Sequence, residues 1–149
     1  MNSSMLLEFM AKLQETYEKA CRPLWMEAEM SKTAFDILLF LGSNPCYHTA
    51  KDISTLKSIR ANVVSMHVDE LVKSGYLTRR RGTEDRRTIE LSYTEKAVPL
   101  IQRGQLVQKK LCEELMDGLP QKDRVIFHSC MDKIIENVMQ LQNKRRMAE

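Results

Sequence analysis

Five arginines surround a single glycine within nine residues of the sequence. The stretch RRRGTEDRR, residues 79–87, also holds Glu84 and Asp85, so its charge of +3 equals the net charge of the whole chain. Of the 23 basic and 20 acidic residues, 18 of each lie outside this stretch. A guanidinium group stays charged at physiological pH and binds phosphate and carboxylate oxygens. A basic cluster on an otherwise balanced chain therefore indicates a local anionic partner.

The cluster is predicted to form the tip of a β-hairpin. Residues 77–81 and 88–92 flank the segment Gly82–Arg86, and polar and apolar side chains alternate from Thr88 onward. Alternation with a period of two is typical of a strand, and a glycine between two such runs favours a turn. The arginines are thus expected on an exposed loop.

Two helices with the pattern of a helix-turn-helix precede this hairpin. A short helix is expected from about Thr49, with Ala50, Ile53 and Leu56 facing inward. A longer helix is expected from about Arg60 to Lys73, because apolar residues recur at helical spacing along one face: Val64, Val68 and Leu71. Two short helices joined by a tight turn, the second with small polar residues at its start, are typical of a DNA-reading unit.

The exposed side chains near the start of the second helix would reach base edges in a major groove. They are Arg60, Asn62, Ser65 and Met66. Asparagine can pair with adenine and arginine with guanine, so these positions are candidates for sequence recognition. Asp69, farther along the same helix, would be repelled by phosphate. We expect it to pair with a cation or to lie along the groove wall.

The rest of the chain predicts further helices on both sides of this unit. They are an amphipathic helix from Leu6 to between Pro23 and Glu29, a helix Lys32–Leu41 capped by Ser31, a helix opened by Thr94 and Glu95, and a last helix from Gln121 after a break at Gly118–Pro120. In the last helix the residues expected to face inward are Phe127, Met131, Ile134, Ile135, Val138 and Leu141. The predicted fold class is mainly α with a small β-hairpin.

Length and composition predict a single domain. A chain of 149 residues can form one substantial core, and 43% hydrophobic with 29% charged residues is typical of a folded protein rather than a disordered one. Charges interrupt every apolar run before it reaches membrane-spanning length, and no basic segment precedes the first apolar residues. We therefore expect a cytoplasmic protein without a membrane partner.

No catalytic or cofactor motif is recognisable. The sequence has no Gly-rich phosphate loop and no nucleophile elbow, and its histidines are scattered without carboxylates at motif spacing: His48, His67 and His128. An enzyme is not expected, and neither is a cofactor. Cys46 and His48, with Asp52 close behind, have the residue types of a metal site, but two ligands in a loop are weak evidence and we predict no metal.

The four cysteines do not form a recognisable motif. Cys21, Cys46, Cys112 and Cys130 are far apart and include no C-x-x-C pair, so we expect reduced and mostly buried thiols. The alternative is a redox-responsive thiol. Cys21 is then the candidate, because Lys19 and Arg22 are close in sequence and would favour its thiolate.

The segment from Thr49 to Ala97 resembles the MarR (multiple-antibiotic-resistance regulator) family of bacterial winged-helix transcription factors. Leu71–Leu77 is similar to the family's Leu-x-x-x-Gly-hydrophobic-hydrophobic at the helix end, and Asp85–Arg87 fits its wing signature Asp-x-Arg. Ser92–Ala97 is similar to Ser-Leu-Thr-x-x-Gly, with Tyr93 and Ala97 as departures. The flanking helices resemble the family in length, order and patterning.

The resemblance implies a winged helix-turn-helix whose wing binds DNA. In the family, a wing arginine enters the minor groove and an aspartate two residues earlier holds its guanidinium; these roles fall to Arg87 and Asp85 here. A narrow minor groove has an enhanced negative potential that attracts arginine. The remaining wing arginines are interpreted as phosphate contacts or as a general electrostatic field: Arg79, Arg80, Arg81 and Arg86.

The resemblance also implies a homodimer on a DNA operator. Residues 1–30 and 98–149 would form the dimerisation helices, and residues 31–97 the DNA-binding region of one MarR-like domain. Family members commonly bind small aromatic or lipophilic effectors, for which the candidates here are Met10, Tyr17, Trp25 and Met26, with core packing as the alternative for each. The expected function is transcriptional regulation, and repression in particular. The rival interpretation is a winged helix that contacts proteins instead of DNA.

Overall fold

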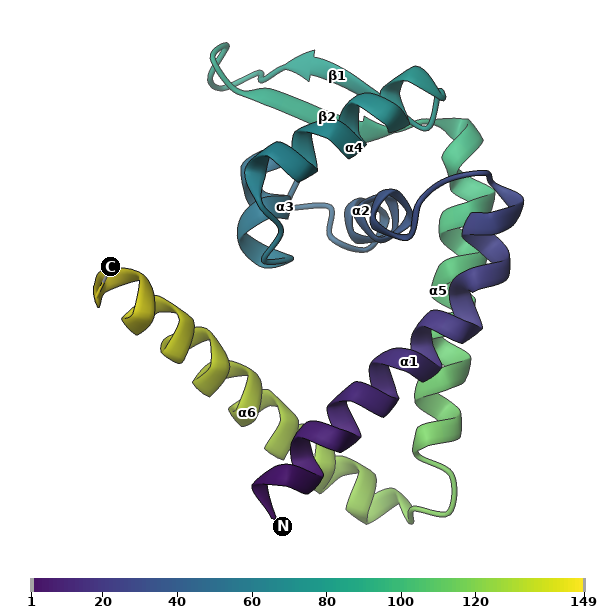
Figure 1. Ribbon diagram of the computed structural model, residues 1–149, viewed down its shortest axis with the longest axis vertical. Coiled ribbons are helices and arrows are strands. Elements are labelled where there is room, and N and C mark those ends of the chain that lie inside the picture. Colours follow the sequence, from purple (N-terminus) through teal and green to yellow (C-terminus); the bar gives the residue numbers. More distant parts are fainter. Residues whose placement is uncertain (1, 149) are drawn as a thin grey trace. The chain divides into compact units, whose positions relative to one another are not determined.

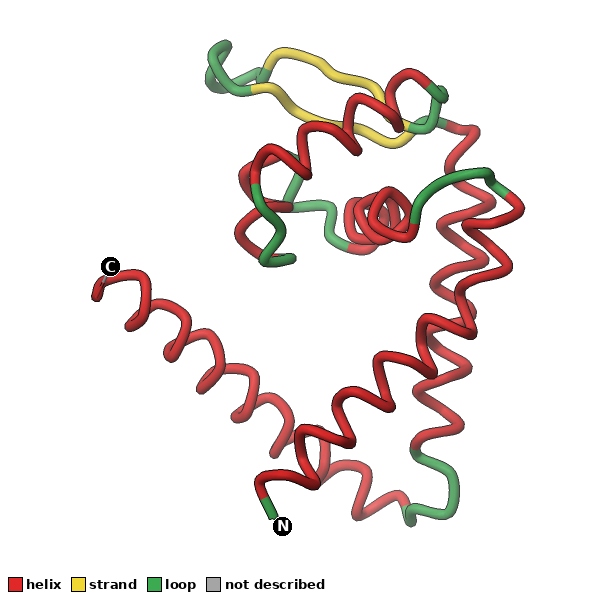
Figure 2. The backbone as a smooth tube through the Cα atoms, viewed as in Figure 1, coloured by secondary structure: helices red, strands yellow, loops and turns green. Residues whose placement is uncertain are grey.

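The computed structural model of the protein describes residues 2–148 and consists of two compact units, one up to Leu111 and one from Cys112 onward. Helices dominate, and the only strands among the described residues form one hairpin (Figure 2). The elements are α1 (Ser3–Glu27), α2 (Lys32–Ser43), α3 (Ala50–Leu56), α4 (Ala61–Lys73), β1 (Leu77–Arg81), β2 (Ile89–Tyr93), a 3₁₀ turn (Glu95–Ala97), α5 (Val98–Leu115) and α6 (Gln121–Ala148). The predicted fold class is confirmed.

Helix α2 lies at the centre of the first unit. The predicted cap is confirmed, since the Ser31 hydroxyl accepts a hydrogen bond of 3.1 Å from the amide of Ala34. Half of the helix's residues are buried, namely Ala34, Phe35, Ile37, Leu38, Leu39 and Leu41. A β-carbon on Gly104 of α5 would lie only 2.9 Å from the Leu39 side chain. Glycine at this position therefore lets α5 pack closely against α2.

Helices α3 and α4 form the predicted helix-turn-helix beside the hairpin (Figure 1). A capping box between Thr49 and Asp52 starts α3, and Gly75, with a φ of 79°, follows the end of α4. Only Ile53 of the residues expected to face inward from α3 is buried. Ala50 and Leu56 are exposed, because a helix of 7 residues presents a single turn to the core.

The hairpin pairs β1 and β2 in antiparallel register from Leu77↔Tyr93 to Arg81↔Ile89. The second strand starts at Ile89, one residue later than predicted. The base of the hairpin is held by the Thr94 amide and hydroxyl, which donate hydrogen bonds to the carbonyl oxygens of Tyr76 (3.0 Å) and Gly75 (2.6 Å) respectively. These bonds fix the direction in which the wing leaves α4.

Helix α6 carries an apolar stripe that its own unit leaves exposed. The prediction of inward-facing residues is wrong for a single copy of the chain, since five of the six are at least 39% exposed: Phe127, Ile134, Ile135, Val138 and Leu141. Apolar residues near the start of α1 are exposed as well, among them Leu7 and Phe9. None of the described helices is long and apolar enough to cross a membrane.

Candidate nucleic-acid interface

One face of α4 is buried and the other is open. Val64, Val68 and Leu71 pack into the core as predicted, and the open face presents Asn62, Ser65, Met66 and Asp69. These four lie at positions i, i+3, i+4 and i+7, which places them along one stripe of the helix. Arg60 is the exposed N-cap residue and its side chain makes no capping bond. The candidate base-contacting residues are therefore gathered at the free N-terminal end of α4.

His67 anchors the buried face of α4. Its Nδ1 lies 3.3 Å from the Ser31 hydroxyl, which caps α2, and 3.1 Å from a carboxylate oxygen of Glu70. The side chain of His67 is buried. Its contacts tie α4 to the N-terminus of α2, so the exposed stripe is carried on a fixed support.

The tip of the wing is a tight turn shaped by Asp85. The Gly82 amide donates to the Thr88 carbonyl (2.8 Å), and the Thr88 amide donates to the Asp85 carbonyl (3.0 Å). A β-carbon on Gly82 would lie 2.6 Å from that same Asp85 oxygen, so only glycine fits this close approach. The Asp85 carboxylate accepts a hydrogen bond of 2.9 Å from the Arg87 amide. Asp85 thus orients the backbone of Arg87, whereas the family resemblance implied a contact with its guanidinium.

The five wing arginines differ in their partners. The Arg79 guanidinium pairs with the carboxylate of Asp69 on α4, which confirms that Asp69 pairs with a cation. The Arg80 Nε lies 3.1 Å from Glu90, the residue directly opposite it in the hairpin. Within residues 2–148, the side chains of the other three have no ion-pair partner and are exposed: Arg81, Arg86 and Arg87. The available positive charge is therefore concentrated at the far end of the wing.

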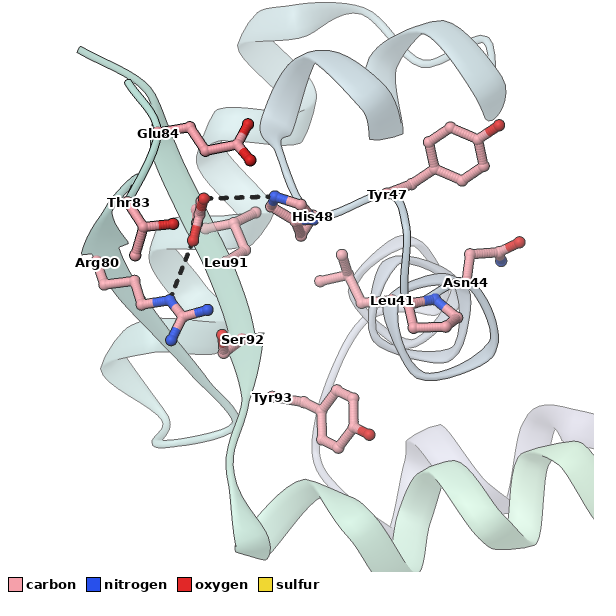
Figure 3. A pocket seen from close by; sticks show the side chains of 12 residues that line it. Leu41, Asn44, Tyr47, His48, Arg80, Thr83, Glu84, Leu91, Ser92 and Tyr93 are labelled. Atoms are coloured by element: carbon pink, nitrogen blue, oxygen red, sulfur yellow. Dashed lines mark hydrogen bonds and ion pairs between the residues drawn. The ribbon is translucent and has the colours of Figure 1, made fainter. Parts of the chain in front are cut away.

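Glu90 also joins the wing to the segment before α3. Its second carboxylate oxygen lies 3.6 Å from His48 Nε2, an ion pair that a dashed line to His48 marks in Figure 3. The Leu91 amide donates a hydrogen bond of 2.7 Å to the His48 carbonyl. A cavity of about 540 Å³ lies beside this cluster, lined in part by Leu41, Tyr47 and Tyr93. Sequence reasoning did not single out Glu90, although the cross-strand position opposite Arg80 was a usable signal once the register was known.

The four candidate effector residues differ in their exposure and in their neighbours. Tyr17 borders a cavity of about 150 Å³, and its hydroxyl lies 3.1 Å from the Gln108 side chain. Trp25 is buried and packs against Phe35 at 5.7 Å between ring centroids, while Met10 and Met26 are exposed. Of the four, only Tyr17 lines one of these cavities, and Trp25 follows the alternative of core packing.

The cysteine predictions need correction. Only Cys21 is buried, whereas Cys46, Cys112 and Cys130 are exposed, since they lie on a loop and on helix surfaces that the described chain leaves uncovered. Burial raises the pKa of the Cys21 thiol, with the nearby Asp36 carboxylate acting in the same direction. A raised pKa disfavours the thiolate, so the proposal of a reactive Cys21 loses its physical basis.

Asp52, one of the three residues with the types of a metal site, takes part in the cap of α3. The Asp52 carboxylate accepts hydrogen bonds from the amides of His48 (3.1 Å) and Thr49 (2.9 Å), which is its task in the capping box. No group of three or more His, Cys, Asp or Glu side chains in the described part of the chain is arranged to hold a metal ion.

Comparison with known proteins agrees with this geometry. A family model described as "MarR family" matches residues 29–88, which contain α2 to α4 and most of the wing. Many solved structures share the fold over almost the whole chain. A MarR protein from Peptoclostridium difficile is 17% identical with a TM-score of 0.75, covering 93% of this chain and 89% of that one.

Two further structures extend this comparison. A MarR transcriptional regulator from Methanosarcina mazei is 17% identical with a TM-score of 0.78, covering 93% of this chain and 99% of the other. The S. aureus MepR–DNA complex is 14% identical with a TM-score of 0.72, covering 92% and 96%. At these identities the likeness concerns the fold. This chain is therefore similar to the MarR family in two respects: its residues 29–88 match the family model, and its fold is that of solved MarR structures over almost the whole chain.

Proposed function

We propose that this protein is a sequence-specific DNA-binding regulator that acts as a homodimer and represses transcription. The observation that carries the proposal is the combination, in one unit, of two features. One is the open polar stripe of α4, and the other is a set of three wing-tip arginines that form no ion pair within residues 2–148. A helix of this kind reads base edges in the major groove, and basic side chains beside it bind the backbone or the adjacent minor groove. The same fold occurs in the S. aureus MepR–DNA complex.

Each candidate residue has a proposed role. Asn62 and Arg60 contact base edges, with Ser65 and Met66 completing the surface that α4 presents to the major groove. Arg87 enters the minor groove, and Asp85 sets the backbone that presents it. Arg81 and Arg86 contact phosphates. Arg79 and Arg80 contribute less, because each is already paired with a carboxylate of the protein.

The homodimer is supported by the apolar surface that one copy leaves exposed. Apolar side chains along α6 and at the start of α1 are exposed far more than is usual for a folded monomer. Covering them with the same helices of a second copy would create a two-fold assembly, and two α4 helices related by this axis would read a near-palindrome. A compact dimer on a promoter blocks polymerase without a further contact surface, which favours repression.

The proposal includes a small aromatic or lipophilic effector, with Tyr17 as the predicted contact. Of the four predicted effector residues, Tyr17 borders the cavity of about 150 Å³, which residues of α2 and α5 also line. A ligand there would contact both the helix that supports α4 and the helices assigned to dimerisation. Ligand binding in this cavity would therefore change the distance between the α4 helices of the two copies.

Titration of fluorescent duplexes with the purified protein tests the function. We expect tight, salt-dependent binding that prefers DNA from upstream of its own coding region over random duplex, because base contacts add to a phosphate term common to all DNA. Absence of binding to either duplex at low salt would contradict the proposal and favour a winged helix that contacts proteins.

Replacing Asn62 with Ala is expected to reduce discrimination more than affinity. A lost bidentate base contact costs about 1–3 kcal/mol on the preferred sequence, whereas binding to random DNA depends mainly on phosphates. The ratio of the dissociation constants for random and preferred duplexes measures this. Equal weakening on both duplexes would show that Asn62 does not read bases.

A further inference from the structure

We propose that Asp69 is a specificity-determining residue: by pairing with Arg79 it withholds one wing arginine from DNA phosphates and so lowers binding to non-cognate DNA. The inference rests on the proposed DNA-binding function. It assigns a role to an acidic residue on the surface of α4 that is expected to face DNA.

The charge of Asp69 lies where it would act on DNA phosphates that approach α4. It lies one turn beyond Ser65 and Met66 on the same exposed stripe as Asn62, and 65% of its side chain is exposed. An unpaired carboxylate at this place would repel every phosphate that approaches α4. The pairing with Arg79 removes this repulsion, and it also removes the attraction that Arg79 would otherwise offer.

Arg79 would be available for phosphate without this partner. Its side chain is 38% exposed, and it stands on β1 between α4 and the wing tip, so it flanks the surface that carries both proposed DNA contacts. An arginine in that place would bind the backbone of any sequence, because phosphates are common to all DNA. Specificity is the difference between the affinities for preferred and for random DNA. Suppressing a contact that is common to all sequences therefore raises specificity, as adding a base contact does.

Protein stability offers a weaker explanation for the pair. Exposed ion pairs contribute little to the free energy of unfolding. The base of the wing is already fixed by the backbone bonds of Tyr76 to Leu71 (2.9 Å) and of Thr94 to Tyr76 (3.0 Å). Removing the carboxylate is therefore expected to leave the fold intact and to change the electrostatics of the DNA-facing surface.

The test compares Asp69→Asn, Arg79→Gln and the double variant with the unmodified protein on random and preferred duplexes over a range of salt concentrations. Asp69→Asn is expected to steepen the salt dependence on random DNA by about 0.9 in log–log slope, as for one added phosphate contact. Over a fourfold change in salt this corresponds to roughly threefold in affinity. The gain on the preferred duplex is expected to be smaller, because base contacts hold that complex in one register.

The double variant distinguishes two cases. In one, Asp69 keeps Arg79 from DNA; in the other, Arg79 contacts DNA in the unmodified protein. It removes one charge of each sign, so its salt slope and its affinity for random DNA should match those of the unmodified protein, whereas Arg79→Gln alone should bind more weakly because Asp69 is left unpaired. Glu84→Gln is the matched control: it makes the same charge change on the wing, and Glu84 has no ion-pair partner among residues 2–148. It should change affinity for both duplexes by the same factor.

Two results would overturn the inference. One is an Asp69→Asn variant whose binding to random DNA is unchanged, or whose two affinities shift by one common factor as in the control. The other is a double variant whose salt dependence is shallower than that of the unmodified protein by the amount expected for one phosphate contact. This would mean that Arg79 contacts DNA in the unmodified protein. Failure of the unmodified protein to bind any duplex would instead overturn the proposed function itself.

Discussion

Replacing Arg87 with Glu is expected to weaken binding to the preferred duplex by about 100-fold, since the change removes a groove contact and adds a repelled charge. Arg87 is exposed at the tip of the wing, has no ion-pair partner in the described chain, and is presented by the bond from its amide to Asp85. Because no packing contact is lost, the melting temperature and the oligomeric state should stay the same. Fluorescence anisotropy at several salt concentrations measures the loss.

The control for this variant is Arg22→Glu. Arg22 is an exposed arginine of α1, so the charge change is identical but lies outside the wing. Because α1 is assigned to dimerisation, sedimentation must show that the Arg22→Glu protein has the same oligomeric state as the unmodified protein. The control should lose far less affinity, because exposed charges more than a Debye length of about 10 Å apart are largely screened. Similar losses in the two variants would show that binding follows net charge and would refute a specific role for Arg87.

The second large effect is expected from the apolar stripe of α6. Changing Ile135 and Val138 together to Glu places two charges on a surface that the proposed dimer would bury, and buried unpaired charges are strongly unfavourable. We expect a monomer by sedimentation or light scattering at micromolar concentration. DNA affinity should fall by roughly 10²–10⁴, because the two reading helices would no longer be linked.

Gln140 and Asn143 provide the matched control on the same helix. Both are exposed polar residues on the side of α6 away from Ile135 and Val138, so changing them to Glu adds the same charge outside the stripe. This control should remain a dimer that binds DNA. If the Ile135 and Val138 variant also remained a dimer with unchanged DNA affinity, α6 would not be the interface. A dimer without DNA binding in that variant would contradict the proposed link between assembly and recognition.

Local features of the fold were predictable because their causes lie within a few residues. Ser31 and Thr49 cap the helices that they precede, Gly75 ends α4, and the hairpin differs from its prediction by one residue. Caps and turns depend on hydrogen bonds between near neighbours and on permitted φ angles, so residue types alone indicate them. The stripe of α4 followed in the same way from helical periodicity.

Contacts between distant elements were less predictable. The lysine and arginine beside Cys21 in sequence suggested a thiolate, but packing of α1 against α2 buries the thiol and raises its pKa. The four candidate effector residues share one helix, yet only Tyr17 borders one of the cavities described above. Their surroundings come from α2 and α5, which are distant in the sequence.

The sequence by itself determined the order of the elements, the basic wing and the polar stripe of α4, because periodicity, caps and local charge are properties of neighbouring residues. Only the tertiary structure decided which of the five wing arginines are paired with a carboxylate of the protein. Arg79 is neutralised by Asp69, ten positions away on another element, and Arg80 by Glu90 across the hairpin, whereas Arg87 is left open. The physical reason is that an ion pair depends on the distance between side chains in space, which the fold sets.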